Sequence, residues 1–160
     1  MDLDRLRQCR SLLFLPASNP RAIEKAKELD ADLIVLDLED SVPDEDKAAA
    51  RDAAAAASRT GFGGKPMAIR VNPTDSRHYG EDVVAVRRSA FDVVVLAKAE
   101  TAKQVADAAW LMAKPVLAMI ETPRGVLDGA AVAPASRGLI AGTNDLAAAL
   151  ALPEGSGRAG

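Results

Sequence analysis

The sequence contains one cysteine and one histidine among 160 residues, which limits the kinds of site it can form. A single cysteine, Cys9, excludes an internal disulfide and any cysteine-rich zinc site. No apolar run approaches the roughly 18 residues of a membrane-spanning helix. The net charge of −3 leaves no basic surplus for a nucleic-acid backbone. The first residues also lack the apolar segment of a signal peptide. We therefore expect a cytoplasmic protein that binds neither membranes nor nucleic acid.

Aromatic residues are scarce as well, at 3% of the chain, so the core must consist of leucine, isoleucine, valine and alanine. The hydrophobic fraction is 49%, which is sufficient for a sizeable core, and the length is typical of one domain. We expect a single domain over residues 1–160. Its last residues, 153–160, should form a flexible end, since the sequence there finishes with the glycine-rich stretch GSGRAG.

The most informative stretch is residues 32–40, with the sequence DLIVLDLED. Its first part is an uninterrupted apolar run from Leu33 to Leu36, as expected for a strand that is buried on both faces. Three acids follow where such a strand would leave the core: Asp37, Glu39 and Asp40. In parallel α/β proteins, chemistry gathers at the C-terminal ends of the strands. This stretch therefore predicts a buried parallel strand with functional acids at its end.

Other segments also consist of an apolar strand followed by polar residues, which we call its polar tip. Further strands are predicted over residues 11–16, 66–71, 92–96, 115–120 and 138–141. Helical patterns alternate with the strands over residues 20–29, 44–57, 81–89, 101–112, 125–132 and 146–150. Such alternation is typical of a parallel α/β fold. The turn after the first strand reads PASNP instead of GxGxxG, which disfavours a doubly wound dinucleotide-binding sheet. We expect the first six βα units of a (β/α)8 TIM barrel.

Alternate residues of a strand share a face, which predicts where the polar tips point. The pairs expected on one face are Asp37 with Val35, Arg70 with Ala68, Lys98 with Leu96, and Glu121 with Met119. In a barrel, these tips would meet at one mouth. The residues expected there are Asp37, Glu39, Arg70, Lys98, Glu121 and Asp145.

Four segments together resemble the citrate lyase beta-subunit-like branch of the HpcH/HpaI aldolase superfamily. They are RSLLFLPASNP (residues 10–20), IVLDLEDSVPDEDKAAAR (34–51), IRVNP (69–73), and the pair AMIETPRG (118–125) with AGTNDLA (141–147). They occur in the family's order, with LAKAE (96–100) between them. Each motif alone is weak, but the combination is specific and covers essentially the whole chain.

The resemblance implies a TIM barrel that cleaves or forms carbon–carbon bonds next to a carbonyl. Its substrates would be acyl-CoA thioesters or 2-oxo or hydroxy acids. It also implies a divalent metal, Mg²⁺ or alternatively Mn²⁺, held by Glu121 and Asp145. Hard carboxylate oxygens suit such an ion, which keeps positions open for water and substrate. Arg70 matches the arginine that contacts substrate oxygens in the family, where it can stabilise a developing enolate.

The remaining candidates surround this group. Asp37 and Glu39 are expected to hold Arg70 or metal-bound waters within the catalytic site. Lys98 is a further catalytic candidate. Two alternatives stay open for it: its aliphatic stem could only pack on the barrel rim, or its amine could form a Schiff base. Two residues near strand ends are candidates for substrate binding: Pro16 and Asn72.

Three features depart from the family pattern. The sequence stops after the sixth strand, whereas a full barrel has about 250 residues. We therefore expect an incomplete barrel that is poorly stable alone, with uncovered edges and apolar surface. Pro16-Ala17 replaces a Pro-Gly pair that is common in relatives using CoA, and Ala149 replaces a second acid. The use of CoA is thus left open, and a homo-oligomer, trimeric or hexameric, is expected from the resemblance.

Two classes of function remain. The first is a metal-dependent carbon–carbon lyase, which retention of Arg70, Glu121 and Asp145 favours. The second is a non-catalytic relative or assembly subunit that keeps the barrel and its ligand pocket. Activity of the protein with Mg²⁺ toward acyl-CoA esters and 2-oxo acids would separate them.

Overall fold

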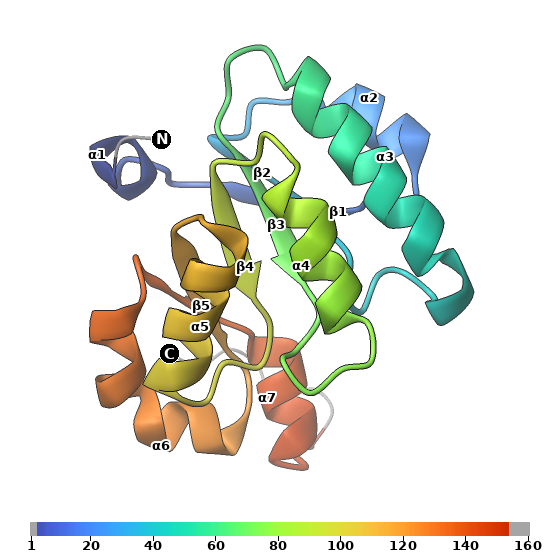
Figure 1. Ribbon diagram of the computed structural model, residues 1–160. Coiled ribbons are helices and arrows are strands. Elements are labelled where there is room, and N and C mark those ends of the chain that lie inside the picture. The colour runs from blue at the N-terminus through green and yellow to red at the C-terminus, as the bar shows by residue number, and fades with distance from the viewer. Residues whose placement is uncertain (1–2, 154–160) are drawn as a thin grey trace.

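A computed structural model describes residues 3–153 and shows one curled sheet of six parallel strands (Figure 1). The strands are neighbours in chain order, as predicted for a partial TIM barrel. Their bounds are β1 Leu12–Pro16, β2 Leu33–Asp37, β3 Met67–Val71, β4 Val93–Leu96, β5 Val116–Ile120 and β6 Leu139–Ala141. Of the end expected to be flexible, residues 154–160 lie outside the described part.

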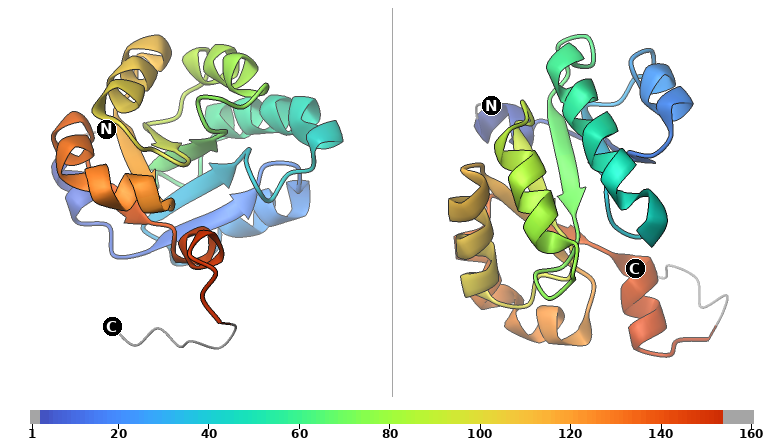
Figure 2. Two further views of the ribbon diagram at one scale, coloured as in Figure 1. Left: turned by 90° about the horizontal axis from the view of Figure 1, so that it is seen from below. Right: turned by 45° about the vertical axis from the view of Figure 1, so that its right-hand side comes forward.

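The helices are α1 Leu3–Arg7, α2 Pro20–Ala26, η1 Asp44–Asp46, α3 Lys47–Thr60, α4 Tyr79–Arg87, α5 Ala102–Met112, α6 Pro123–Val132, η2 Ala133–Ala135 and α7 Thr143–Ala149. Helices α2 to α6 lie along the convex side of the sheet (Figure 2), whereas α1 precedes β1 and α7 follows β6. Leu6 of α1 packs against apolar residues of the concave side. Three of the helices, α2, α5 and α6, begin with a capping side chain. The Asn19 side chain accepts a hydrogen bond from Ala22 N at 3.1 Å, and Thr101 forms a capping box with Gln104.

The sheet separates two apolar layers, because alternate strand residues point to opposite faces. Between the sheet and the helices lies the larger layer, which includes Ile34, Leu36, Ile69 and Leu96. The concave side carries a smaller layer that comprises Leu33, Val35, Ala68, Val93, Val95, Leu117 and Met119. The concave layer corresponds to the interior of a barrel. It continues toward the C-terminal ends of the strands, where the polar residues begin.

The barrel is open along the edges formed by β1 and β6, which are not paired with each other. A cavity of about 480 Å³ lies there, and its apolar lining includes Leu6, Leu12, Phe14 and Leu139. Leu139 is 46% exposed. The low stability expected for such an arc stays a prediction.

Several helix boundaries differ from the sequence prediction by a few residues, including those of α3, α4 and α6. Helix α2 ends at Ala26 and not near Leu29, whose side chain is 38% exposed and contributes little to the core. Helix α7 begins at Thr143, so Asp145 lies in its first turn and not at the tip of the preceding strand. Acids are favoured in a first helical turn, which accounts for this shift.

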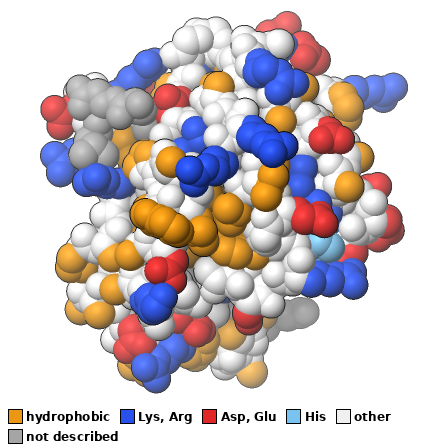
Figure 3. Space-filling model, viewed as in Figure 1, with side chains coloured by type: hydrophobic (Ala, Val, Ile, Leu, Met, Phe, Trp, Pro, Cys, Tyr) orange, Lys and Arg blue, Asp and Glu red, His pale blue; other side chains and the backbone are white. Residues whose placement is uncertain are grey.

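On the face seen in Figure 3, basic and acidic side chains both occur, with apolar side chains between them. The net charge of −3 is consistent with this mixture. Over residues 3–153, no helix has the length and apolar character that crossing a membrane requires.

Candidate active site

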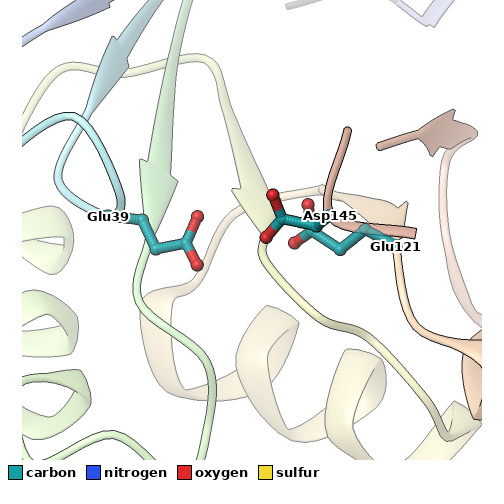
Figure 4. Close-up of side chains that lie close together, drawn as sticks. All are labelled: Glu39, Glu121 and Asp145. Atoms are coloured by element: carbon teal, nitrogen blue, oxygen red, sulfur yellow. The ribbon is translucent and has the colours of Figure 1, made fainter. Parts of the chain in front are cut away.

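Three carboxylates from distant parts of the chain meet at the C-terminal rim of the sheet (Figure 4). Glu39 lies in the loop after β2, Glu121 directly follows β5, and Asp145 lies in α7. One oxygen atom from each lies within 4.8 Å of the others. Glu39 and Glu121 are buried, and Asp145 is partly exposed. The structure thus brings together the two predicted metal ligands and adds Glu39 to them.

Arg70, at the end of β3, is the cation on one side of this group. Its Nε and Nη2 atoms donate to the two carboxylate oxygens of Asp37, each at 2.6 Å. Its Nη1 atom lies 2.8 Å from Oε2 of Glu39. The paired bonds to Asp37 fix the plane of the guanidinium, as two-point contacts between arginine and a carboxylate do. Predicted contacts of Asp37 and Glu39 with Arg70 are therefore present.

Asp37 stays ionised because of these contacts. Burial alone would raise its pKa, but the hydrogen bonds and charge of Arg70, together with Ser41, outweigh burial and hold the pKa below its ordinary value. Ser41 Oγ donates to Asp37 at 2.5 Å. Burial would lower the pKa of Arg70, yet Asp37 and Glu39 raise it further above its ordinary range. This pair is a fixed positive and negative unit on the rim.

Lys98 supplies the second cation of the site. Its Nζ atom donates to Oε1 of Glu39 and lies 3.3 Å from Oδ2 of Asp145. Burial would lower the pKa of Lys98, but the hydrogen bond and charge of Glu39 raise it above its ordinary value. A Schiff-base lysine needs a neutral amine, so these surroundings disfavour that alternative.

The strand alternation predicted for Lys98 is wrong, although the side chain still reaches the rim. Leu96 packs in the layer under the helices and not in the concave layer. Strand β4 ends at Leu96, and Lys98 has a φ of 49°, in the left-handed region. This conformation is uncommon for a residue with a side chain and breaks the alternation. The turn directs the ammonium toward Glu39.

Glu39 is the most perturbed carboxylate of the site. Burial raises its pKa to about 7, although the charges of Lys98 and Arg70 oppose this rise. Its Oε2 atom is buried and has no well-aligned hydrogen bond from any described residue, despite the nearby Nη1 of Arg70. A buried carboxylate oxygen without a well-aligned hydrogen bond has capacity for a contact with a bound ion.

Glu121 is held by main-chain atoms around it. The backbone N–H of Lys98 donates to its Oε1 at 2.8 Å. Burial raises the pKa of Glu121 above its ordinary value, and the N–H and charge of Lys98 oppose this. On its other side lies Gly142, where an added Cβ would stand 2.5 Å from both Cβ and Oε2 of Glu121. A glycine is needed at position 142 for Glu121 to lie where it does.

A cavity of about 470 Å³ opens beside these groups. Its lining includes Phe14, Arg70, Met119, Glu121 and Asp145. With Asp40 also in the lining, one cation and three acids lie beside apolar side chains. Such a cavity accommodates a small acid with several oxygen atoms.

The two predicted substrate-binding residues lie at different places. Pro16 pairs in register with Asp37 at the end of β1. Asn72 is buried outside the carboxylate group: its Nδ2 donates to Asp82 at 2.7 Å and to Leu38 O at 3.0 Å. Lys47 Nζ donates to its Oδ1 at 2.9 Å. These contacts describe a residue that orders the loop after β2, and contact with substrate stays a prediction for both.

Sequence reasoning did not single out Lys47 or Gly142. Lys47 is buried and donates to the carbonyl oxygens of Leu38 at 2.7 Å and Glu39 at 2.8 Å, so it holds the segment that carries Glu39. Both residues lie inside the family motifs. Their roles depend on which backbone atoms approach them, and sequence gives no signal for that.

The site fits a divalent cation of the kind that prefers oxygen ligands. Its donors are carboxylate oxygens from Glu39, Glu121 and Asp145, without histidine or cysteine among them. Such a set suits Mg²⁺ or Mn²⁺ better than zinc. The buried Oε2 of Glu39 and the glycine that makes room for Glu121 both support this fit.

Comparisons with known proteins agree with this geometry. The family model described as HpcH/HpaI aldolase/citrate lyase matches residues 10–158. A protein named (3S)-malyl-CoA thioesterase from Cereibacter sphaeroides is 40% identical over 142 aligned positions, and the match covers 86% of this chain and 50% of that protein. A citrate lyase subunit beta-like protein of Mycobacterium tuberculosis is 36% identical over 140 aligned positions, and the match covers 86% of this chain and 49% of that protein.

Solved structures give the same result. The citrate lyase beta subunit of M. tuberculosis, complexed with oxaloacetate and magnesium, is 34% identical with a TM-score of 0.79. The match covers 92% of this chain and 64% of that one. The present chain spans about half the length of the curated relatives it matches.

Proposed function

Because the chain belongs to the HpcH/HpaI aldolase/citrate lyase family, we propose that it is a Mg²⁺-dependent carbon–carbon lyase. The reaction would be an aldol- or Claisen-type cleavage or condensation of an acyl-CoA thioester or a 2-oxo or hydroxy acid. The observation that carries this proposal is the convergence of Glu121, Asp145 and Glu39 beside Arg70. The relative of known structure, complexed with magnesium and oxaloacetate, supports the choice of ion and substrate class.

Glu121 and Asp145 are the proposed metal ligands, and Glu39 lies close enough to bind the ion or a water on it. When bound, Mg²⁺ would polarise a carbonyl or carboxylate of the substrate as a Lewis acid. The burial of Glu121 and Glu39 keeps bulk water away from these ligands. The main-chain N–H of Lys98 holds Glu121 in one orientation, as partners of metal ligands commonly do.

Arg70 is the proposed partner of the substrate's developing charge. Cleavage of a carbon–carbon bond next to a carbonyl leaves the bonding electron pair on an enolate, whose oxygen is negative. Arg70 lines the cavity, and Asp37 fixes its guanidinium before substrate arrives. A cation that needs no reorganisation stabilises such an oxygen most effectively.

The test of this proposal combines chelation with two isosteric substitutions. EDTA should abolish cleavage and Mg²⁺ should restore it. Glu121→Gln and Asp145→Asn each remove a charged ligand with little change of shape, so both should weaken Mg²⁺ binding while the fold persists. Asp52→Asn, at an exposed position of α3, is the matched control and should bind normally. Activity that survives exhaustive chelation would contradict the proposal.

A second candidate is hydrolysis of a CoA thioester, favoured by the name of the 40% identical relative. The products separate the two reactions. Hydrolysis releases a free thiol and the intact acid, whereas cleavage releases a carbonyl compound and a shorter acyl-CoA. If ligands bind without either set of products, the non-catalytic alternative applies.

A further inference from the structure

The ammonium of Lys98 occupies the place among the carboxylates where a cation is required. Its Nζ atom donates to Oε1 of Glu39 and lies 3.3 Å from Asp145 and 3.6 Å from Asp40. Carboxylates as close as Glu39, Glu121 and Asp145 repel one another unless a cation or proton compensates them. Arg70 compensates Glu39 from one side, at 2.8 Å from its Oε2 atom. Lys98 is the cation that contacts both Glu39 and Asp145.

The backbone and the side chain of Lys98 serve separate purposes. The N–H group, in a turn with φ of 49°, donates to Glu121. The side chain is 32% exposed, and its ammonium contacts carboxylates and not the main chain that holds Glu121. The ammonium can therefore move while the contact to Glu121 is kept. Asp40 offers a nearby partner for it, since the Asp40 side chain is 51% exposed.

We infer that the Lys98 ammonium is a built-in counter-ion that stabilises the metal-free site and yields its place to the divalent cation by moving toward Asp40. This inference rests on the proposed metal site and specifies how that site is controlled. The arriving ion takes over the charge compensation of Glu39 and Asp145. Lys98 is thereby a competitor of the metal, and its removal should tighten metal binding.

The expected size of the effect follows from the distances. Two unit charges about 4 Å apart near a protein surface interact strongly enough to change an equilibrium constant by more than tenfold. Part of that interaction persists when the ammonium moves to Asp40. Lys98→Met should therefore tighten Mg²⁺ binding about tenfold and lower the melting temperature of the metal-free protein.

The experiment is calorimetric titration of Mg²⁺ into the wild type, Lys98→Met and Lys103→Met, with melting curves recorded with and without Mg²⁺. Lys103 is a matched control, because its side chain is 82% exposed and pairs with Asp107 on α5. We expect Lys98→Met to bind more tightly, with its lower melting temperature corrected by Mg²⁺, and Lys103→Met to behave as the wild type. Binding by Lys98→Met that is equal to or weaker than that of the wild type overturns the inference, even if the wild type binds normally. A wild type that binds no Mg²⁺ overturns the proposed metal site as well.

A second measurement tests the movement toward Asp40. Asp40→Asn should weaken Mg²⁺ binding in the wild type, because the displaced ammonium loses its partner. The same substitution should have a smaller effect when Lys98 is already methionine. This double-mutant cycle isolates the part that Lys98 transmits. Equal effects in both backgrounds would overturn the movement toward Asp40.

Discussion

A single methyl group at position 142 should weaken metal binding without unfolding the protein. In Gly142→Ala, the new Cβ would stand 2.5 Å from both Cβ and Oε2 of Glu121. Real Cβ atoms essentially never approach other heavy atoms within 3.0 Å, so Glu121 or the segment carrying Gly142 must move. The backbone itself tolerates alanine, because φ at Gly142 is −88°. The effect is therefore steric and centred on a proposed metal ligand.

The magnitude follows from overpacking. Inserting a methyl group into a filled space costs about 1–3 kcal/mol. Replacement of glycine also removes freedom from the unfolded chain, which offsets about 0.4–1 kcal/mol. The free energy of unfolding should thus fall by no more than about 2.6 kcal/mol. If Glu121 relieves the strain by moving, Mg²⁺ affinity should fall roughly ten- to hundredfold, since about 1.4 kcal/mol corresponds to a factor of ten.

The assay is calorimetric titration of Mg²⁺ together with urea unfolding of the metal-free protein. Gly129→Ala in α6 is the matched control, because no atom lies within 4 Å of its added Cβ. Alanine is the better helix former, so the control should gain stability slightly and bind Mg²⁺ normally. Wild-type affinity in Gly142→Ala would refute the reasoning, because Glu121 would then not need its observed position to bind the ion.

Three further predictions concern charge. Arg70→Lys keeps the charge but loses the paired hydrogen bonds of the guanidinium. The value of kcat/KM should therefore fall on the order of 10²–10³-fold, with little change in melting temperature. A near-normal kcat/KM would remove Arg70 from the catalytic group. Burial raises the pKa of Glu39 to about 7 and also raises that of Glu121, so protons compete with Mg²⁺. Affinity measured by calorimetry should rise between about pH 6 and pH 8, and a flat profile would contradict this. The pKa of Asp37 is lower in the folded protein than in the unfolded chain. The stabilisation from its pairing with Arg70 is therefore present above the unfolded-state pKa, and it is lost as pH falls through the folded-state pKa. Asp37→Asn should cost about 3–5 kcal/mol near neutral pH in urea unfolding, and the difference from wild type should shrink in acid.

The pattern of hydrophobic residues predicted the alternating strands and helices of the barrel, because such a pattern can be read from local sequence alone. The run from Leu33 to Leu36 has the apolar character of a strand covered on both faces, and β2 is buried throughout. Parallel strands joined by helices place all strand ends on one side, so the common rim followed from the order of elements. The combined motifs identified the family, which the match over residues 10–158 confirmed.

The alternation of side chains between the two faces of a strand predicted the direction of Asp37, Arg70 and Glu121. The same rule gave the wrong direction for Lys98. Asp37, Arg70 and Glu121 continue their strands closely enough for the period of two to hold, and each faces the concave side. Lys98 follows the end of β4 through a turn with positive φ, where that period no longer applies. Local sequence contains no clear sign of such a turn, because lysine seldom adopts it.

Sequence by itself determined the parallel α/β architecture, the family and the set of residue types available at the rim, because each depends on local pattern or on motifs in order. Tertiary structure alone decided that Glu39 joins Glu121 and Asp145, that Lys98 lies among them, and that Gly142 leaves room for Glu121. These relations depend on distances between atoms whose residues lie 21 to 106 positions apart in the numbering. Burial and neighbouring charge then set the pKa of each carboxyl, and both arise only when the strands are packed side by side.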